Sequence, residues 1–272
     1  MSLQLISALE NARTLIPRAI PEFAAGTLGE LAHAHGLGSL FRSRGVCELL
    51  LSGVVDPLFT AQMQSTGAYV FGLARATEDD KVTSLGGCLW DAIAAEYWDA
   101  ATQIATLSRM THHAAREHED DFLYVAFLMQ RYLLAPGDDA DLEAHEQQQQ
   151  QRLDRWEEVL EGGLDPRLDL CHALRDQDHE AFAEAIVTTA EARTEDLQRR
   201  HAKGALTNEE LAWLLPIWPE GLALLRLAER EGLATDGLEV PGVPPVIRVT
   251  NPYAYHPEAW RSMDPRPARR PR

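Results

Sequence analysis

Apolar residues recur at three- and four-residue steps along most of this chain, a spacing that places them on one face of an α-helix. The first such stretch runs from Leu3 to Ile16 and is expected to stop before Pro17, because proline removes a helix hydrogen bond. Gly36 and Gly38 are expected to separate the next helices. Further helices are predicted over the apolar stretches 46–51, 58–73, 89–107, 122–134, 153–160, 168–174, 182–197, 211–215 and 222–227. The pattern therefore predicts an all-α protein.

A weak internal repeat groups some of these helices into pairs. The segments that begin at Cys88 and Cys171 each contain a short helix, a polar turn and a second, alanine-rich helix. Cys47 opens a similar segment, and the spacings approach one and two periods of HEAT-like helix pairs. Chance similarity between helical hairpins explains the pattern equally well. Either interpretation predicts stacked antiparallel helical hairpins, in a HEAT- or TPR-like array or in an irregular bundle.

Proline ends this pattern near residue 240. We expect a single all-α domain over residues 1–240 and a Pro-rich extended tail over residues 241–272. Residues 246–249 are predicted to form a short extended piece, and the terminal arginines to belong to a mobile tail. The acidic and glutamine-rich stretch 138–151 is expected to be a flexible or exposed helical entry to the helix at Leu153.

The composition is that of a soluble globular protein with a strong acidic bias. The 272 residues are 45% hydrophobic and 25% charged, and the formal net charge is −17. Such a field repels nucleic-acid backbones and anionic membrane surfaces and attracts basic proteins. We therefore expect neither nucleic acid nor a membrane as a partner. An acidic surface that only aids solubility is the plainer alternative, and the oligomeric state is left open.

The cysteines and the N-terminus indicate the cellular compartment. Cys47, Cys88 and Cys171 are widely spaced and form no CxxC pair, so neither a disulfide framework nor a thiolate zinc site is indicated. Each is expected to be a small buried apolar residue. The first helix carries charged residues and so does not resemble a signal peptide, and no apolar run approaches the ~20 residues that span a bilayer. These features predict a cytoplasmic protein.

The most informative segment is an acidic cluster that continues directly into an uncharged, mostly apolar stretch at residues 122–129. The cluster contains Glu117, Glu119, Asp120 and Asp121. Apolar side chains at every angle around a helix indicate that protein surrounds it, so we expect four carboxylates at the mouth of a central helix. Helix capping or internal ion pairs would explain them if the helix begins near Glu117. A basic partner, a metal or catalysis are the alternatives.

Histidines beside this cluster suggest a metal site as one alternative. His112, His113 and His118 lie close to it in sequence, and His113 and Glu117 have the helical spacing of metal ligands. However, the chain has neither a matching second Glu-x-x-His nor a His-Glu-x-x-His motif. A metal-dependent enzyme centred on residues 112–121 is therefore the weaker hypothesis. Serine-hydrolase, phosphate-binding and dinucleotide motifs are also absent, so no catalytic residue and no cofactor is predicted.

Three short segments carry a resemblance to a known family. Glu117–Tyr124, with the sequence EHEDDFLY, is followed by Arg167–Phe182 and Glu220–Leu233. Together they resemble the immunity protein 49 family of bacterial polymorphic-toxin systems, over most of residues 45–235. In such systems an immunity protein protects the producing cell and its kin by binding a cognate toxin.

The resemblance implies a function that agrees with the acidic composition. The family's acidic motif corresponds to Glu117, Glu119, Asp120 and Asp121, and we expect these residues to bind the toxin. The expected partner is a basic toxin domain, such as a nuclease, held stoichiometrically and partly by electrostatic attraction. A helical-repeat scaffold that binds an endogenous protein through the same residues is the alternative.

Overall fold

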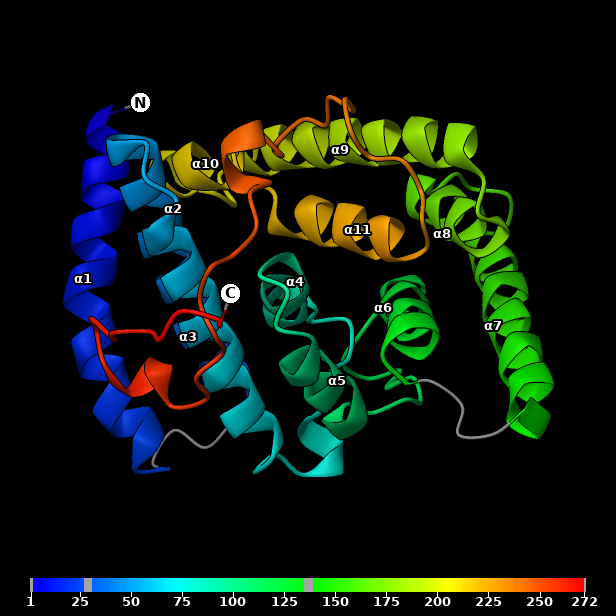
Figure 1. Ribbon diagram of the computed structural model, residues 1–272, viewed down its shortest axis with the longest axis horizontal. Coiled ribbons are helices and arrows are strands. Elements are labelled where there is room, and N and C mark those ends of the chain that lie inside the picture. Colours follow the sequence, from blue (N-terminus) through cyan, green and yellow to red (C-terminus); the bar gives the residue numbers. More distant parts are fainter. Residues whose placement is uncertain (1, 27–30, 135–138, 272) are drawn as a thin grey trace.

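The computed structural model describes residues 2–26, 31–134 and 139–271, and within these ranges it is helical and contains no β-sheet (Figure 1). The all-α prediction is confirmed. The α-helices are α1 (Ser2–Ala24), α2 (Leu31–Ser52), α3 (Asp56–Leu73), α4 (Gly87–Ala94), α5 (Trp98–Leu107), α6 (Glu119–Tyr132), α7 (Asp139–Leu160), α8 (Pro166–Asp176), α9 (His179–Ala202), α10 (Asn208–Leu214) and α11 (Pro219–Arg230). Three short 3₁₀ helices are η1 (Glu78–Asp80), η2 (Pro245–Ile247) and η3 (Ala259–Arg261).

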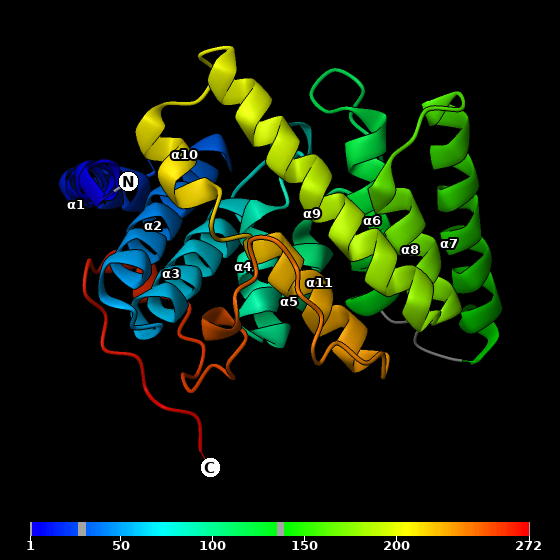
Figure 2. The ribbon, with the colours of Figure 1, turned by 90° about the horizontal axis from the view of Figure 1, so that it is seen from above.

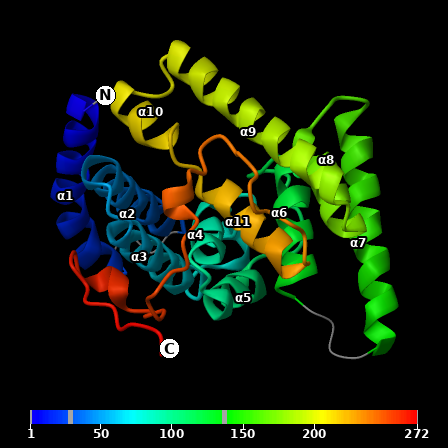
Figure 3. The same cartoon turned by 45° about the horizontal axis from the view of Figure 1, so that its top comes forward.

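The helices form an irregular bundle rather than a regular repeat array. α1, α2 and α3 lie side by side at one end, α7 and α8 lie at the other, and α4, α5, α6 and α11 lie between them (Figures 1 and 2). α9 crosses above α11 and joins the α8 end to the α10 end (Figure 3). α4 packs mainly against α11, which lies far from it in the sequence. A solenoid repeat contacts only adjacent repeats, so this pairing excludes a simple HEAT- or TPR-like array.

Protein surrounds α6, as its sequence predicted. Every residue from Phe122 to Met129 is buried. The three cysteines are also buried and unbonded, which confirms that they act as small apolar residues. In the stretch 138–151, Asp138 lies outside the described residues, and residues 139–151 form the first half of α7. This half of α7 is largely exposed over residues 142–151.

The prediction that the first helix stops before Pro17 is wrong. α1 continues through Pro17 and Pro21 to Ala24. Both prolines lie on its exposed face, whereas Ile16 and Phe23 are buried. A proline inside a helix costs about 3 kcal/mol. Burial of a large apolar side chain contributes about 1.5–3 kcal/mol, so tertiary packing offsets the local preference.

Gly36 and Gly38 do not separate two helices, because both lie inside α2. A Cβ at Gly38 would lie 2.7 Å from Cys88 Sγ and 2.8 Å from Ser65 Oγ. Glycine at position 38 therefore lets α2 approach α3 and α4 closely, and its role is packing rather than chain reversal.

The apolar spacing predicted one helix over the stretch 89–107, whereas the repeat beginning at Cys88 predicted two, and the structure has two. The stretch is divided between α4 and α5, and Glu96 in the connection has a φ of 58°. The Ala95 carbonyl accepts hydrogen bonds from Asn251 Nδ2 at 2.9 Å and Arg270 Nη2 at 3.1 Å. These donors come from the far end of the chain, and they bind at the polar turn that the repeat beginning at Cys88 had predicted.

Residues 241–271 contain no α-helix, but they are not extended throughout. η2 replaces the extended piece that we expected at residues 246–249. Trp260, in η3, is fully buried against Phe23 and Phe71. Contrary to the expectation of a mobile terminus, Arg270 donates hydrogen bonds to the Ala95 and Glu96 carbonyls. This segment therefore lies along the helical body.

One stretch, residues 208–230, has the length and mean hydropathy of a membrane-spanning helix. Most of it is buried inside the protein. It is also divided into α10 and α11 at Pro216 and Pro219. Burial of this kind is typical of a core helix, so the length and hydropathy of this stretch are weak evidence for a membrane span.

Candidate functional site

The acidic cluster lies at the N-terminus of α6. His118 is the N-cap residue, with extended backbone, and Glu119, Asp120 and Asp121 occupy the first turn. The helix thus begins near Glu117, as the capping explanation of the acids required. Carboxylates are stabilising there, because the first backbone N–H groups have no partner within the helix and the N-terminal end of the helix dipole is positive. The electrostatics of the helix N-terminus therefore explain part of the cluster. The four acids differ in the contacts that their side chains make.

Glu117 precedes the helix and connects two loops. Its Oε2 accepts a hydrogen bond from the Ser84 backbone N–H at 2.8 Å, and its Oε1 accepts one from the His113 N–H at 3.1 Å. The Glu117 carbonyl also lies 3.0 Å from His112 Nε2. Both carboxylate oxygens thus have backbone donors, and Glu117 fixes the loop before α6 against the loop before α4.

Glu119 forms an ion pair at the surface. Arg155, on α7, donates from Nε and Nη2 to the two Glu119 oxygens at 2.8 and 3.1 Å. The hydrogen bond from Arg155 is the main reason why the pKa of Glu119 lies below its ordinary value. Because both side chains contact solvent, the pair contributes little to stability.

Arg167 is the centre of the remaining interactions. Its guanidinium lies 2.7 Å from Asp121, 3.6 Å from Asp120 and 2.7 Å from Asp165. Burial disfavours the charged guanidinium, but the hydrogen bonds to Asp165 and Asp121 outweigh this and raise the pKa of Arg167. Arg167 also stacks over the Tyr124 ring at 5.2 Å. One cation thus serves three carboxylates, and the group stays negative.

A cleft of about 500 Å³ opens beside this group. It lies between the C-terminal half of α9 and the starts of α6, α8 and α11. Its lining residues are Asp121, Asp165, Pro166, Arg167, Thr189, Ala192, Arg193, Asp196, Arg199, Trp218 and Glu220. The structure therefore brings Asp121 to the edge of a concave surface, together with residues more than 90 positions away in the chain.

Sequence reasoning missed most of this cleft. Asp165-Pro166-Arg167 is a helix-start signal: Asp165 caps the Arg167 N–H at 3.0 Å, and Pro166 is the first helical residue. That signal could have placed Arg167 at a helix N-terminus. No local signal marks Arg193 or Trp218, because only the packing of α9 against the start of α11 brings them together.

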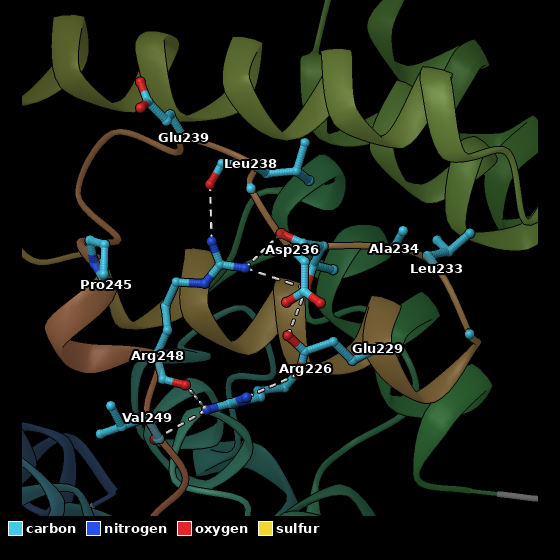
Figure 4. Close-up of a pocket in the computed structure, with 13 residues that line it drawn as sticks. Arg226, Glu229, Leu233, Ala234, Asp236, Leu238, Glu239, Pro245, Arg248 and Val249 are labelled. Atoms are coloured by element: carbon cyan, nitrogen blue, oxygen red, sulfur yellow. Dashed lines mark hydrogen bonds and ion pairs between the residues drawn. The ribbon is translucent and has the colours of Figure 1, made fainter.

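A larger cleft, of about 890 Å³, lies under the loop that follows α11 (Figure 4). Its two arginines hold the loop in place. Arg248 donates to the Leu238 carbonyl at 3.0 Å and the Thr235 carbonyl at 2.7 Å, and Arg226 donates to the Arg248 carbonyl at 2.7 Å. Because these guanidinium groups are engaged with the backbone, the cleft has a structural explanation, and the cleft beside α6 is the stronger candidate.

The histidines near the acidic cluster do not converge with its carboxylates. Among the residues that the structure describes, no group of three or more His, Cys, Asp or Glu side chains is arranged to hold a metal ion. His118 is exposed, and His112 contacts the Glu117 carbonyl. The geometry does not bring together the ligand set that a site at residues 112–121 would need.

Comparison with known protein families gives a match. A family model described as immunity protein 49 matches residues 54–246. This range includes the acidic cluster and every residue that lines the cleft beside it. No curated protein and no solved structure matches the chain.

Proposed function

The chain belongs to the immunity protein 49 family, and from this premise we propose that it neutralises a cognate toxin by binding it as a protein partner. The observation that carries the proposal is the family match over more than half of the chain. We propose a binding protein rather than an enzyme, acting in the cytoplasm of the cell that makes it.

Charge supports a basic toxin domain as the partner. The formal net charge of −17 attracts a cationic domain and speeds the encounter between the two proteins. A nuclease is one such domain, because its substrate groove must be cationic to hold nucleic acid. An acidic surface that enters this groove would exclude the substrate.

We propose that the contact lies at the N-terminus of α6, at Asp120 and Asp121, with Glu119 beside them. About a third or more of each aspartate side chain is exposed, 33% for Asp120 and 42% for Asp121. They share Arg167 with Asp165, so a lysine or arginine of the toxin would meet carboxylates that are incompletely neutralised. Glu117 acts differently in this proposal: it positions the loop before α6 through its two backbone hydrogen bonds.

The first experiment tests immunity itself. Cells that express the toxin candidate encoded beside this gene are grown with and without this protein, and the two proteins are then co-purified. Rescue of growth together with a stoichiometric complex supports direct neutralisation. A toxic neighbour with neither rescue nor complex would contradict that pairing and favour the scaffold alternative.

The second experiment locates the contact. The double variant D120N/D121N should lower the association rate constant for the toxin by about tenfold at low salt, because rate constants depend on such local charges. The association rate constant of this variant should also depend less on the salt concentration than that of the wild type. The matched control D236N/E239Q removes two exposed charges from the loop after α11, and it should retain most of the rate. Equal effects of the two double variants would mean that only net charge matters and that the α6 cluster is not the contact.

A further inference from the structure

The guanidinium of Arg167 is fixed on the side that faces the protein interior. Asp165, two residues before it, accepts hydrogen bonds from Nε at 3.0 Å and from Nη2 at 2.7 Å, and only 10% of the Asp165 side chain is exposed. Two buried aromatic rings, those of Tyr124 and Trp156, have their centroids 5.2 and 5.8 Å from the guanidinium carbon. A planar fork that is paired through two nitrogens and stacked on rings is restricted to one orientation.

The outer side of the same guanidinium contacts the two aspartates of α6. Nη1 donates to Oδ1 of Asp121 at 2.7 Å, and Nη2 lies 3.6 Å from Oδ2 of Asp120. Among the residues that the structure describes, none donates a hydrogen bond to the other oxygen of either aspartate. Arg167 thus determines how the two carboxylates are oriented and leaves one oxygen of each for a partner.

The neighbouring pair at Glu119 lacks this support. Of the Arg155 side chain 51% is exposed, compared with 26% for Arg167. Arg155 also divides its hydrogen bonds between Glu119 and Glu158, and both of these carboxylates are at the surface. Exposed pairs of long side chains lose much of their electrostatic gain to the entropy of holding one geometry. Arg167 is therefore the cation of this region that can position a carboxylate.

We propose that Arg167 is the positioning residue of the toxin contact: it holds Asp120 and Asp121 so that their free oxygens accept one basic side chain of the toxin. The inference rests on the proposed function and specifies how that contact is made. Three carboxylates share the one guanidinium, which leaves a formal charge of −2 on the group. An added lysine or arginine is attracted by this charge and meets acceptors that already have their orientation.

Charge and positioning affect different rate constants. The charge near an interface changes mainly the association rate constant, whereas the quality of the close contacts changes mainly the dissociation rate constant. Arg167→Lys keeps the charge but loses the planar fork, because one ammonium cannot pair with Asp165 through two nitrogens and also hold Asp121. Arg167→Gln loses both the charge and the fork. The two variants therefore separate positioning from charge.

The first test measures binding of the toxin encoded beside this gene by surface plasmon resonance. For R167K, the dissociation rate constant should rise at least about tenfold, while the association rate constant stays within about twofold of the wild type. For R167Q, the dissociation rate constant should rise as much, and the association rate constant should increase by about twofold or more at low salt, because the site becomes more negative. D120N/D121N changes the association rate constant in the opposite direction. A merely structural lesion would not speed association.

Arg13 provides the matched control. It pairs with Glu48 at 2.9 Å on the exposed surface of α1, at the opposite end of the molecule from α8 (Figures 1 and 2). R13K and R13Q repeat the two changes there, and both should leave the dissociation rate constant within about twofold of the wild type. Circular dichroism checks that every variant is folded. A complex whose dissociation is the same for R167K and the wild type would overturn the positioning role, and so would equal effects of R167Q and R13Q.

A second measurement uses the free protein and does not depend on the toxin. Three-bond NMR couplings to the Cγ carbons report the side-chain rotamers of Asp120 and Asp121. One rotamer of Asp121 should dominate in the wild type, and R167K should populate several. Averaged rotamers in the wild type, or a dominant rotamer that persists in R167K, would overturn the positioning role even if the toxin binds. Fixed rotamers in a wild-type protein that binds no toxin would instead contradict the proposed function, and the contact with it.

Discussion

Asp91 is the most deeply buried charged side chain among the described residues. Its side chain is fully inaccessible, and it accepts hydrogen bonds from Arg42 Nε at 3.0 Å, Arg42 Nη2 at 2.7 Å and Ser65 Oγ at 2.6 Å. Burial disfavours a charged guanidinium, but the attraction of Asp91 outweighs it and raises the pKa of Arg42. Arg42, Ser65 and Asp91 thus connect α2, α3 and α4 through their side chains.

Removal of one partner should therefore be costly. Arg42→Met leaves the Asp91 carboxylate buried without its cation, and we expect a loss of about 3–5 kcal/mol in the free energy of unfolding. Urea denaturation followed by circular dichroism measures it. The control is Arg13→Met, which breaks the exposed Arg13–Glu48 pair and should cost at most about 1 kcal/mol. Similar losses in the two variants would mean that burial does not determine how much an ion pair of this protein contributes to stability.

The cysteine thiols give a prediction about pH. Burial raises the pKa of Cys47 and Cys88 to about 11, and that of Cys171 well above its ordinary value. The thiolate is the reactive form, so at pH 8 the native protein should react with iodoacetamide only slowly, whereas the protein in urea should react at all three cysteines. Mass spectrometry counts the modified thiols. Rapid modification of native Cys88 would contradict the prediction.

The same pKa shifts have a consequence for stability. Above the ordinary thiol pKa of 9.0, the unfolded chain loses thiol protons while folded Cys88 keeps its own up to about pH 11. The folded state then binds more protons than the unfolded state. Linkage requires that this contribution to stability decreases as the pH rises through that window.

At the scale of elements, glycine determines how closely α2 and α3 pack. A Cβ at Gly45 would lie 2.4 Å from the Ala61 Cβ and 2.9 Å from the Pro57 carbonyl. Real side chains do not approach so closely, and both obstacles belong to the neighbouring helix. Gly36, on the same helix, would place a Cβ in open space.

These two glycines make a matched pair. Gly36→Ala should stabilise the protein by about 0.5–1 kcal/mol, because alanine favours helix more than glycine does. Gly45→Ala gains the same helix preference but forces the helices apart, and we expect a net loss of about 1–3 kcal/mol. Thermal unfolding should show opposite shifts in Tm. A rise in Tm for G45A would mean that the close approach of α2 and α3 is not a constraint.

At the scale of the whole molecule, the C-terminal segment joins distant parts of the chain. Trp260 packs against Phe23 of α1, with ring centroids 5.2 Å apart, and against Phe71 of α3 at 4.9 Å. Gln64 on α3 donates to the Ser262 carbonyl, and Asn251 donates to the Ala95 carbonyl. The segment is thus part of the packed structure, although it lies almost entirely beyond the family match that ends at residue 246.

Trp260→Ala tests this integration. Removal of a fully buried tryptophan side chain should cost about 3–5 kcal/mol in the free energy of unfolding. Val249→Ala, in the same segment but largely exposed, should change it by less than about 0.5 kcal/mol. Urea denaturation compares the two. If W260A were as stable as V249A, the segment would not be packed on the body.

Local information was sufficient for much of the secondary structure. The apolar spacing predicted the helices, since burying one face requires side chains at three- and four-residue steps. Residues 122–129 indicated a surrounded helix because they offer no polar face, and α6 is buried on all sides. The acids before them indicated a helix N-terminus, where unpaired N–H groups and the dipole favour carboxylates. Each of these effects acts within a few residues, so each can be inferred from one amino-acid sequence alone.

Other features depend on contacts between distant residues, and these only the folded arrangement reveals. α1 continues through Pro17 because Phe23 is buried against Trp260 from the other end of the chain. Asn251 donates a hydrogen bond to the Ala95 carbonyl at the turn between α4 and α5, a contact that no local pattern indicates. The cleft beside α6 exists because α9 packs across the starts of three helices. Helix periodicity specifies which face is buried but not against which neighbour, and for this reason the cleft beside α6 has no signature in the sequence.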